Sequence, residues 1–125
     1  MKRSPQRTKQ NTRLTRINDE IARVTADIIR SEMSDPRIGS VVSVMRAETT
    51  SDMKFCKIYV SVLGDTEQQA GTMEALKSGT GFIRRRIAEI INLRATPEIA
   101  FVFDDSIAYG MRMRQLIDEV NRDLK

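Results

Sequence analysis

Two glycines and three consecutive arginines form the stretch of this sequence best suited to binding chemistry. Gly79-Thr80-Gly81 interrupts a helical pattern that runs over Thr66–Ser78 before it and Phe82–Leu93 after it. Two glycines inside one helix cost about 2 kcal/mol relative to alanine, so we expect a kink at which a new helix begins. The first N–H groups and the dipole of that helix favour an anion. Because Arg84-Arg85-Arg86 follows at once, the stretch predicts phosphate binding and hence a nucleic-acid ligand.

A basic N-terminus is the second candidate for contact with phosphates. Six cations precede the first acidic residue, Asp19: Lys2, Arg3, Arg7, Lys9, Arg13 and Arg16. One interpretation is a basic arm that lies along a polyanion. The other is a solvated, disordered terminus without a binding role. We assign residues 1–11 to a flexible basic arm and residues 12–125 to a single domain.

Composition restricts the remaining classes of function. The chain of 125 residues has a net charge of +4, a pI of about 9.6, no histidine and one cysteine, Cys56. Without histidine, a Ser-His-Asp or Cys-His nucleophile and the usual zinc sites are excluded. Asp104-Asp105 falls short of a divalent ligand set, so we expect no metal, no cofactor and no enzyme, and we interpret Cys56 as a buried structural thiol. The lone cysteine indicates a reducing compartment, and neither a signal peptide nor a membrane span is visible, so we expect a cytoplasmic protein.

The first element that must position these residues is an amphipathic helix. Its apolar residues recur at steps of three and four: Leu14, Ile17, Ile21, Val24 and Ile28. It should end near Ser34, because Pro36 disfavours the α conformation at the residue before it. A tight connection over residues 35–39 follows.

Two strands, the kinked helix pair, a third strand and a last helix follow. Residues 41–48 and 55–63 predict an antiparallel hairpin. Thr66-Glu67-Gln68-Gln69 fits a capping box at the next helix. Residues 99–103 are apolar throughout, which predicts a strand covered on both faces by helices or a partner, parallel to the second strand. A last helix with an apolar stripe begins after Asp104-Asp105. The result is an α+β fold of order α-β-β-α-(kink)-α-β-α, with a three-stranded mixed sheet packed by helices.

This order, with a glycine break between the middle helices, resembles a type II KH domain. Several motifs are similar to those of the ribosome-binding factor A family. They are Ser34-Asp35-Pro36-Arg37-Ile38-Gly39, the segment Ser51–Ser61, Gly81-Phe82-Ile83-Arg84, Leu93–Ile99 and Asp104-Asp105-Ser106-Ile107. They occur in order between about Arg13 and Met113.

The resemblance implies a non-catalytic assembly factor for the small (30S) ribosomal subunit. It implies binding to immature 30S particles and 16S rRNA, support of late rRNA processing including 5′-end maturation, and a role in cold adaptation. It also implies release with the help of a ribosome-associated GTPase. We expect a monomer that makes no contact with membranes. The rRNA-binding residues expected on this basis are Arg7, Lys9, Arg13, Arg16, Arg37, Lys77, Gly79, Gly81, Arg84, Arg85, Arg86 and Arg94.

The kink departs from the KH pattern in two ways. Ordinary KH domains hold nucleotides with Gly-x-x-Gly, whereas Gly79-Thr80-Gly81-Phe82 lacks the second glycine. The family has Ala-x-Gly, so that Gly81 matches and Gly79 replaces the alanine. The added backbone freedom should loosen the kink, and the departure argues against a standard KH grip.

The cations also have structural interpretations. Successive helical residues rotate by about 100°, so the three arginines cannot face one way. Arg85 should point outward, where it could pair with Glu89. We expect at least two of the three to contact phosphate. Arg37 and Arg94 could bind phosphate or cap helix carbonyls, and Tyr59 could stack on a base but is better explained by packing. The alternative function is a protein-interaction module that uses the third strand or the last helix.

Overall fold

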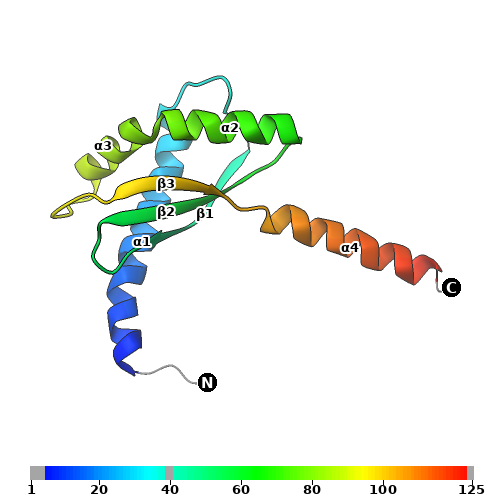
Figure 1. Cartoon of the computed structure of the whole chain (residues 1–125), viewed down its shortest axis with the longest axis horizontal. Helices are drawn as coiled ribbons and strands as arrows, with labels where there is room; N and C mark the ends of the chain where they lie inside the picture. Colours follow the sequence, from blue (N-terminus) through cyan, green and yellow to red (C-terminus); the bar gives the residue numbers. More distant parts are fainter. Residues whose placement is uncertain (1–4, 39–40, 124–125) are drawn as a thin grey trace.

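The helices and strands follow one another in the predicted order. The computed structural model describes the backbone of residues 5–38 and 41–123, and the side chains of residues 12–38, 41–105 and 113–122. The elements (Figure 1) are α1 (Pro5–Glu32), β1 (Val42–Thr49), β2 (Phe55–Val62), α2 (Thr66–Ser78), α3 (Thr80–Ile90), β3 (Glu98–Phe103) and α4 (Ser106–Asp123). The predicted α+β class and the break between α2 and α3 are confirmed.

The sheet has the predicted mixed topology, with strand order β1-β2-β3. β1 pairs antiparallel with β2, placing Ala47 opposite Ile58, and the register shifts at a bulge between Val44 and Arg46. β2 pairs parallel with β3, placing Ile58 beside Phe101. The parallel pairing follows from the helical crossover between β2 and β3, which is long enough to return the chain to the same end of the sheet.

The hydrophobic core lies on one face of this sheet. Alternate residues of β2 are buried, because successive side chains of a strand point to opposite faces. The helices add buried side chains to the same cluster: Ile21, Val24 and Ile28 of α1, Leu76 of α2, and Ile83 and Ile87 of α3. Helices α1, α2 and α3 therefore cover the same face. Cys56 is 1% exposed, and burial raises the pKa of its thiol, which confirms the structural interpretation of this residue.

The opposite face of the sheet carries a polar network around Tyr59. The guanidinium of Arg46 lies 3.9 Å from the centre of the Tyr59 ring. The Tyr59 hydroxyl donates to Glu48 (3.0 Å), and Arg46 donates to Glu48 (3.1 Å) and to Asp104 (3.2 Å). The hydrogen bond to Glu48 raises the pKa of Tyr59. Because Arg46 covers the ring, the contacts favour a packing role for Tyr59 over base stacking.

Helix α1 is longer than the sequence pattern indicated. It begins at Pro5 and so includes residues 5–11, which the sequence analysis assigned to the flexible arm. Proline suits this position, because the first helical turn needs no hydrogen-bonded N–H. The helix ends at Glu32, two residues before the expected end. The flexibility of the arm stays a prediction, and residues 1–4 lie outside the described residues.

The capping box of α2 lies one residue earlier than predicted. Asp65, not Thr66, is the N-cap: its carboxylate accepts from Gln68 N (2.8 Å), and Gln68 Oε1 accepts from Asp65 N (2.8 Å). Asp65 has extended backbone angles, and its carboxylate accepts from the helix N-terminus better than a hydroxyl does. Gln69 instead donates to the carbonyls of Val62 and Gly64.

We therefore expect Asp65→Ala to lower the free energy of unfolding by about 0.5–2 kcal/mol, since it removes the cap. Thr66→Ala should change it by less than about 0.5 kcal/mol, because that side chain does not cap α2. Chemical denaturation of both variants checks the assignment. A larger loss of unfolding free energy for Thr66→Ala than for Asp65→Ala would show that Thr66 is the N-cap.

The third strand and the last helix are less covered than the sequence indicated. β3 is an edge strand in which Ile99 is buried, Ala100 is exposed and Phe103 is 36% exposed. Within the described residues, helices do not cover both faces of this strand, and cover by a partner stays a prediction. α4 extends away from the body (Figure 1), and its stripe of Met113, Leu116, Ile117 and Val120 is 39–56% exposed. Helical periodicity shows that a face is apolar, but it does not show what covers that face.

Candidate nucleic-acid interface

A groove opens at the end of the sheet that lies opposite α4. The turn between β1 and β2 and the connector between α3 and β3 lie at this end (Figure 1). The groove has a volume of about 1360 Å³ and is lined by residues of α1, of the turn, of the connector and by Arg84 of α3. We call it the basic groove. Its lining residues are Arg13, Leu14, Ile17, Ser51, Asp52, Met53, Lys54, Phe55, Arg84, Leu93, Arg94, Ala95, Thr96 and Glu98.

Cations outnumber carboxylates in the basic groove. Its lining contains four cations, Arg13, Lys54, Arg84 and Arg94, and two carboxylates, Asp52 and Glu98. Asp52 is already engaged, since it accepts from the Thr50 hydroxyl (2.6 Å) and from Lys54 N (3.1 Å). These hydrogen bonds hold the pKa of Asp52 below its usual value. The groove therefore presents an excess of positive charge to a ligand.

Three of the cations predicted to bind rRNA line the basic groove, together with a fourth cation that was not predicted. Arg13, Arg84 and Arg94 are distant in sequence and come together only in the fold. Lys54 was not among the expected binding residues, although it lies within the segment Ser51–Ser61 that carries the family resemblance. In the described part of the chain, no ion pair involves Arg13, Lys54 or Arg94. Their charges are therefore available for a ligand.

A tight turn positions Lys54 and Phe55. Thr50 N donates to Phe55 O (2.8 Å), and Phe55 N donates to the Thr50 hydroxyl (3.1 Å). Met53 adopts the left-handed conformation with φ of 64°, which is uncommon for residues other than glycine. Glu98 N donates to Lys54 O (2.9 Å) and thereby joins the turn to β3. These contacts fix the backbone on one wall of the groove.

Arg84 stabilises the opposite wall. Its Nε donates to Pro97 O (3.1 Å), and its Nη2 donates to Thr96 O (2.7 Å). The guanidinium thus holds the connector that carries Arg94, while its charge stays at the edge of the groove. Carbonyl binding, which was considered for Arg37 and Arg94, is therefore seen at Arg84, although the carbonyls belong to the connector and not to a helix.

Arg86 and Arg85 differ from the sequence-based assignment. Arg86 pairs with Glu32 of α1 (2.7 Å) and with Glu89 (2.6 Å), and these carboxylates raise its pKa. The predicted pair between Arg85 and Glu89 is therefore wrong: Arg86 takes Glu89 because the two are three residues apart on one helix face. Arg85 is exposed, with its guanidinium 5.9 Å from the centre of the Phe82 ring.

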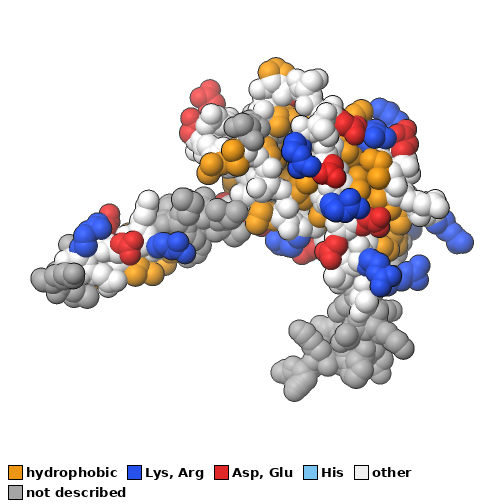
Figure 2. Space-filling model, turned by 180° about the vertical axis from the view of Figure 1, so that it is seen from behind, with side chains coloured by type: hydrophobic (Ala, Val, Ile, Leu, Met, Phe, Trp, Pro, Cys, Tyr) orange, Lys and Arg blue, Asp and Glu red, His pale blue; other side chains and the backbone are white. Residues whose placement is uncertain are grey.

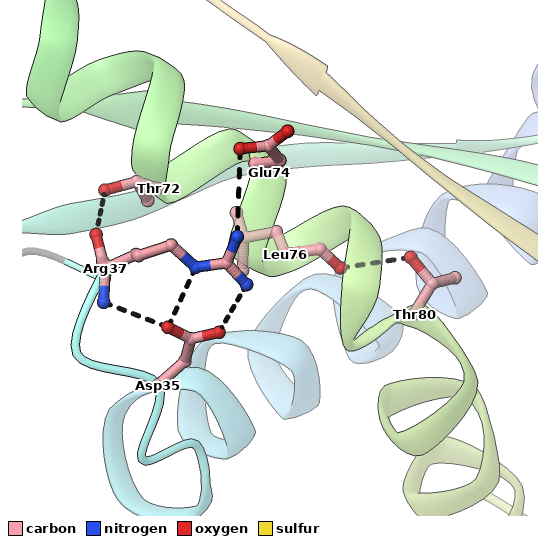
Figure 3. A network of polar contacts seen from close by, with 6 residues as sticks. All are labelled: Asp35, Arg37, Thr72, Glu74, Leu76 and Thr80. Atoms are coloured by element: carbon pink, nitrogen blue, oxygen red, sulfur yellow. Dashed lines mark hydrogen bonds and ion pairs between the residues drawn. The ribbon is translucent and has the colours of Figure 1, made fainter.

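Arg37 is also engaged within the chain, in the network of Figure 3. It donates to Asp35 from Nε (3.1 Å) and Nη2 (2.7 Å), and its Nη1 lies 3.7 Å from Glu74. The Arg37 guanidinium lowers the pKa of Asp35 to about 2, so the pair is ionised at neutral pH. The Thr72 hydroxyl donates to Arg37 O (3.0 Å). The side chain thus contacts carboxylates, whereas the two predicted alternatives were a phosphate and helix carbonyls.

The N-terminus of α3 at the kink lacks a side-chain cap. Gly79 caps α3 without a side-chain hydrogen bond. Its φ of −90° is accessible to other residues, but a Cβ there would lie 2.6 Å from Met33 Cε. A Cβ on Gly81 would meet nothing within 4 Å. Thr80 donates its hydroxyl to Leu76 O (3.0 Å), which continues the polar contacts across the break (Figure 3).

The other predicted cations lie outside the groove. Lys77 is exposed in the last turn of α2, and Arg16 is exposed on α1. Arg7 and Lys9 belong to α1, but their side chains lie outside the described residues. Figure 2 shows that basic and acidic side chains are intermixed over the face seen from behind. The net charge is therefore not gathered into one uniform patch on that face.

The described residues contain neither a cluster suited to a metal ion nor a membrane-spanning helix. No three His, Cys, Asp or Glu side chains there lie close enough to hold a metal ion. No helix of that part of the chain is long and apolar enough to cross a membrane.

Comparison with known proteins agrees with the fold and the motifs. The family described as "Ribosome-binding factor A" matches residues 13–117. A ribosome-binding factor A of Lachnospira eligens is 51% identical over 112 residues, covering 90% of this chain and 86% of the relative. A Thermotoga maritima candidate for the same factor, solved by NMR, is 32% identical with a TM-score of 0.63, covering 69% of this chain and 81% of its own. A Thermus thermophilus ribosome binding factor A, fitted into a cryo-EM map of a 30S complex, is 18% identical with a TM-score of 0.61, covering 74% and 96%.

Proposed function

The chain belongs to the ribosome-binding factor A family, and we propose that it is a non-catalytic assembly factor that binds immature 30S particles through their 16S rRNA. The observation that carries this proposal is the basic groove, whose cations Arg13, Lys54 and Arg94 form no ion pair within the described residues. A family relative fitted into a 30S complex supports the same partner. Phosphates of rRNA are the polyanion that such a groove would meet on a ribosomal particle.

The kink supplies the second contact in this proposal. The N-terminus of α3 attracts anions through its dipole and its backbone N–H groups. Exposed Arg85 and Lys77 flank this terminus in the sequence and carry no ion pair within the described residues. Phosphate contacts fix position and orientation but not sequence, so selectivity for immature particles would come from the shape of the rRNA.

The mechanism that follows is a shift in the population of rRNA conformations. A factor that binds one conformation more tightly than another favours it by that difference in affinity. Late processing of the rRNA, including maturation of its 5′ end, would proceed from the favoured conformation. The requirement for the factor would be greatest in the cold, because rRNA rearranges slowly at low temperature. Release by a ribosome-associated GTPase belongs to the same proposal.

Sedimentation of the purified chain with immature and mature small subunits, over a series of salt concentrations, tests the proposal. We expect co-sedimentation that favours immature particles and falls as salt rises, because phosphate contacts release counterions. If the chain sediments with neither particle at low salt, the proposed function is wrong while the fold stands.

A matched pair of glycine substitutions tests the kink. Gly81→Ala and Gly71→Ala should each raise the free energy of unfolding by about 0.5–1 kcal/mol, because both sites have room for a Cβ within a helix. Only Gly81→Ala should weaken binding to immature particles, by severalfold, because its Cβ would obstruct a phosphate at the N-terminus of α3. Thermal unfolding and co-sedimentation provide the two measurements. Equal binding by both variants would exclude the kink from the interface.

The exposed stripe of α4 favours a second candidate function, a protein-interaction module. Met113, Leu116, Ile117 and Val120 form one apolar face that the described residues leave open. A mass that rises with concentration in sedimentation equilibrium would support this function. A constant monomer mass would support the predicted monomeric state.

A further inference from the structure

Phe55 is an exposed aromatic residue inside the basic groove. It is the first residue of β2, is 53% exposed and lines the groove directly after Lys54. A single exposed apolar side chain is ordinary on a protein surface. Phe55 differs because it shares one cavity with four cations and with the apolar side chains of Leu14, Ile17 and Leu93.

The ring is held on a rigid support. Thr50 binds the backbone of Phe55 at both its N–H and its carbonyl, and the ladder to β3 places Phe55 beside Glu98. The turn before it is fixed by the left-handed Met53 and by the hydrogen bond from Lys54 N to Asp52. A platform that is ordered before binding loses little entropy when a ligand stacks on it.

We propose that the basic groove binds an unpaired stretch of RNA, with one base stacked on Phe55 and the adjoining phosphates on Lys54, Arg13 and Arg94. This inference rests on the proposed function and specifies the form of RNA that the site takes. An aromatic ring beside cations matches a single strand, which offers base faces and phosphates together. In a duplex the base faces are already stacked on one another, so that none is available to stack on the Phe55 ring.

Arg84 acts in this site as a positioning residue. Through its bonds to Thr96 and Pro97 it holds the connector that brings Arg94 toward the groove. Glu98, which lines the same cavity, excludes phosphate from its own part of the groove by repulsion.

Fluorescence anisotropy with a labelled 12-nucleotide oligoadenylate and with a blunt-ended RNA duplex of equal length tests the inference. For the oligoadenylate we expect Phe55→Leu to weaken binding at least fivefold and Phe55→Tyr to bind as the unmodified chain does. For the duplex we expect weaker binding that Phe55→Leu leaves unchanged. Leu63→Ala, which removes a 65% exposed apolar side chain outside the groove, is the control and should change neither affinity.

A 2-aminopurine base in the oligoadenylate gives a direct signal of stacking. Its fluorescence should fall on binding to the unmodified chain and to Phe55→Tyr, but not to Phe55→Leu. Circular dichroism establishes that each variant is folded. The inference is overturned if Phe55→Leu binds the single strand as tightly as the unmodified chain does. It is also overturned if the unmodified chain binds the duplex more tightly than the single strand, or does not bind the single strand. Co-sedimentation of the unmodified chain with immature particles in those cases would leave the proposed function standing.

Discussion

Simultaneous replacement of Arg13, Lys54 and Arg94 by alanine should weaken binding to immature 30S particles at least tenfold and flatten its salt dependence. The three side chains line one groove and have no ion-pair partner within the described residues, so their charges act on the ligand. Each phosphate contact with a single strand contributes about 0.7 to the slope of log affinity against log salt. Loss of three contacts should therefore reduce the slope by about 2. Co-sedimentation over a salt series measures both quantities.

A charge-matched variant separates this effect from a change in net charge. Arg23, Arg114 and Arg122 are exposed and lie outside the groove, so their joint replacement by alanine removes the same charge. We expect this control to lower affinity slightly through the long-range field and to keep most of the slope. If both triple variants lose affinity equally, the groove has no special role in binding.

Ile58→Ala should have the largest effect on stability, lowering the free energy of unfolding by about 2–5 kcal/mol. Ile58 lies on the central strand, is 0% exposed and packs in the cluster shared with α1, α2 and α3. Truncation removes apolar contacts and leaves a cavity that close-packed neighbours fill only in part. Denaturant unfolding measures the loss, and Ile58→Val should lose only about 0.5–1.5 kcal/mol.

Leu116→Ala on α4 is the control for this prediction. Leu116 belongs to an equally periodic apolar stripe but is 54% exposed, so the loss should stay below about 0.5 kcal/mol. A loss as large as that of Ile58→Ala would mean that the α4 stripe is buried in solution, against the body or against another copy.

The apolar stripes of α1 and α4 show that helical periodicity predicts an apolar face but does not predict whether that face is buried. The steps of three and four residues in α1 predicted a buried face, and Ile21, Val24 and Ile28 are buried. The same spacing in α4 predicted an apolar face, yet Met113, Leu116 and Val120 are exposed. Periodicity records how one helix distributes its side chains, whereas burial depends on a second element.

Side-chain partners of the arginines were the least predictable part of the candidate site. The sequence placed Arg84, Arg85 and Arg86 beside the kink, but only packing of α1 against α3 brings Glu32 to Arg86. Likewise, Arg37 is engaged by Glu74 from α2 as well as by nearby Asp35. No local rule links residues that are dozens of positions apart.

The order of the elements, the hairpin, the parallel third strand, the break at Gly79 and the family could all be predicted from the residues alone. These depend on local periodicity, on glycine and proline, on the handedness of crossovers and on motifs that lie along the chain. The three-dimensional packing determines which cations form no ion pair and which of them line one groove with Phe55. The groove forms where α1, the turn before Phe55 and the connector before β3 converge. Side chains from separate segments share a site only after the core has fixed the positions of those segments.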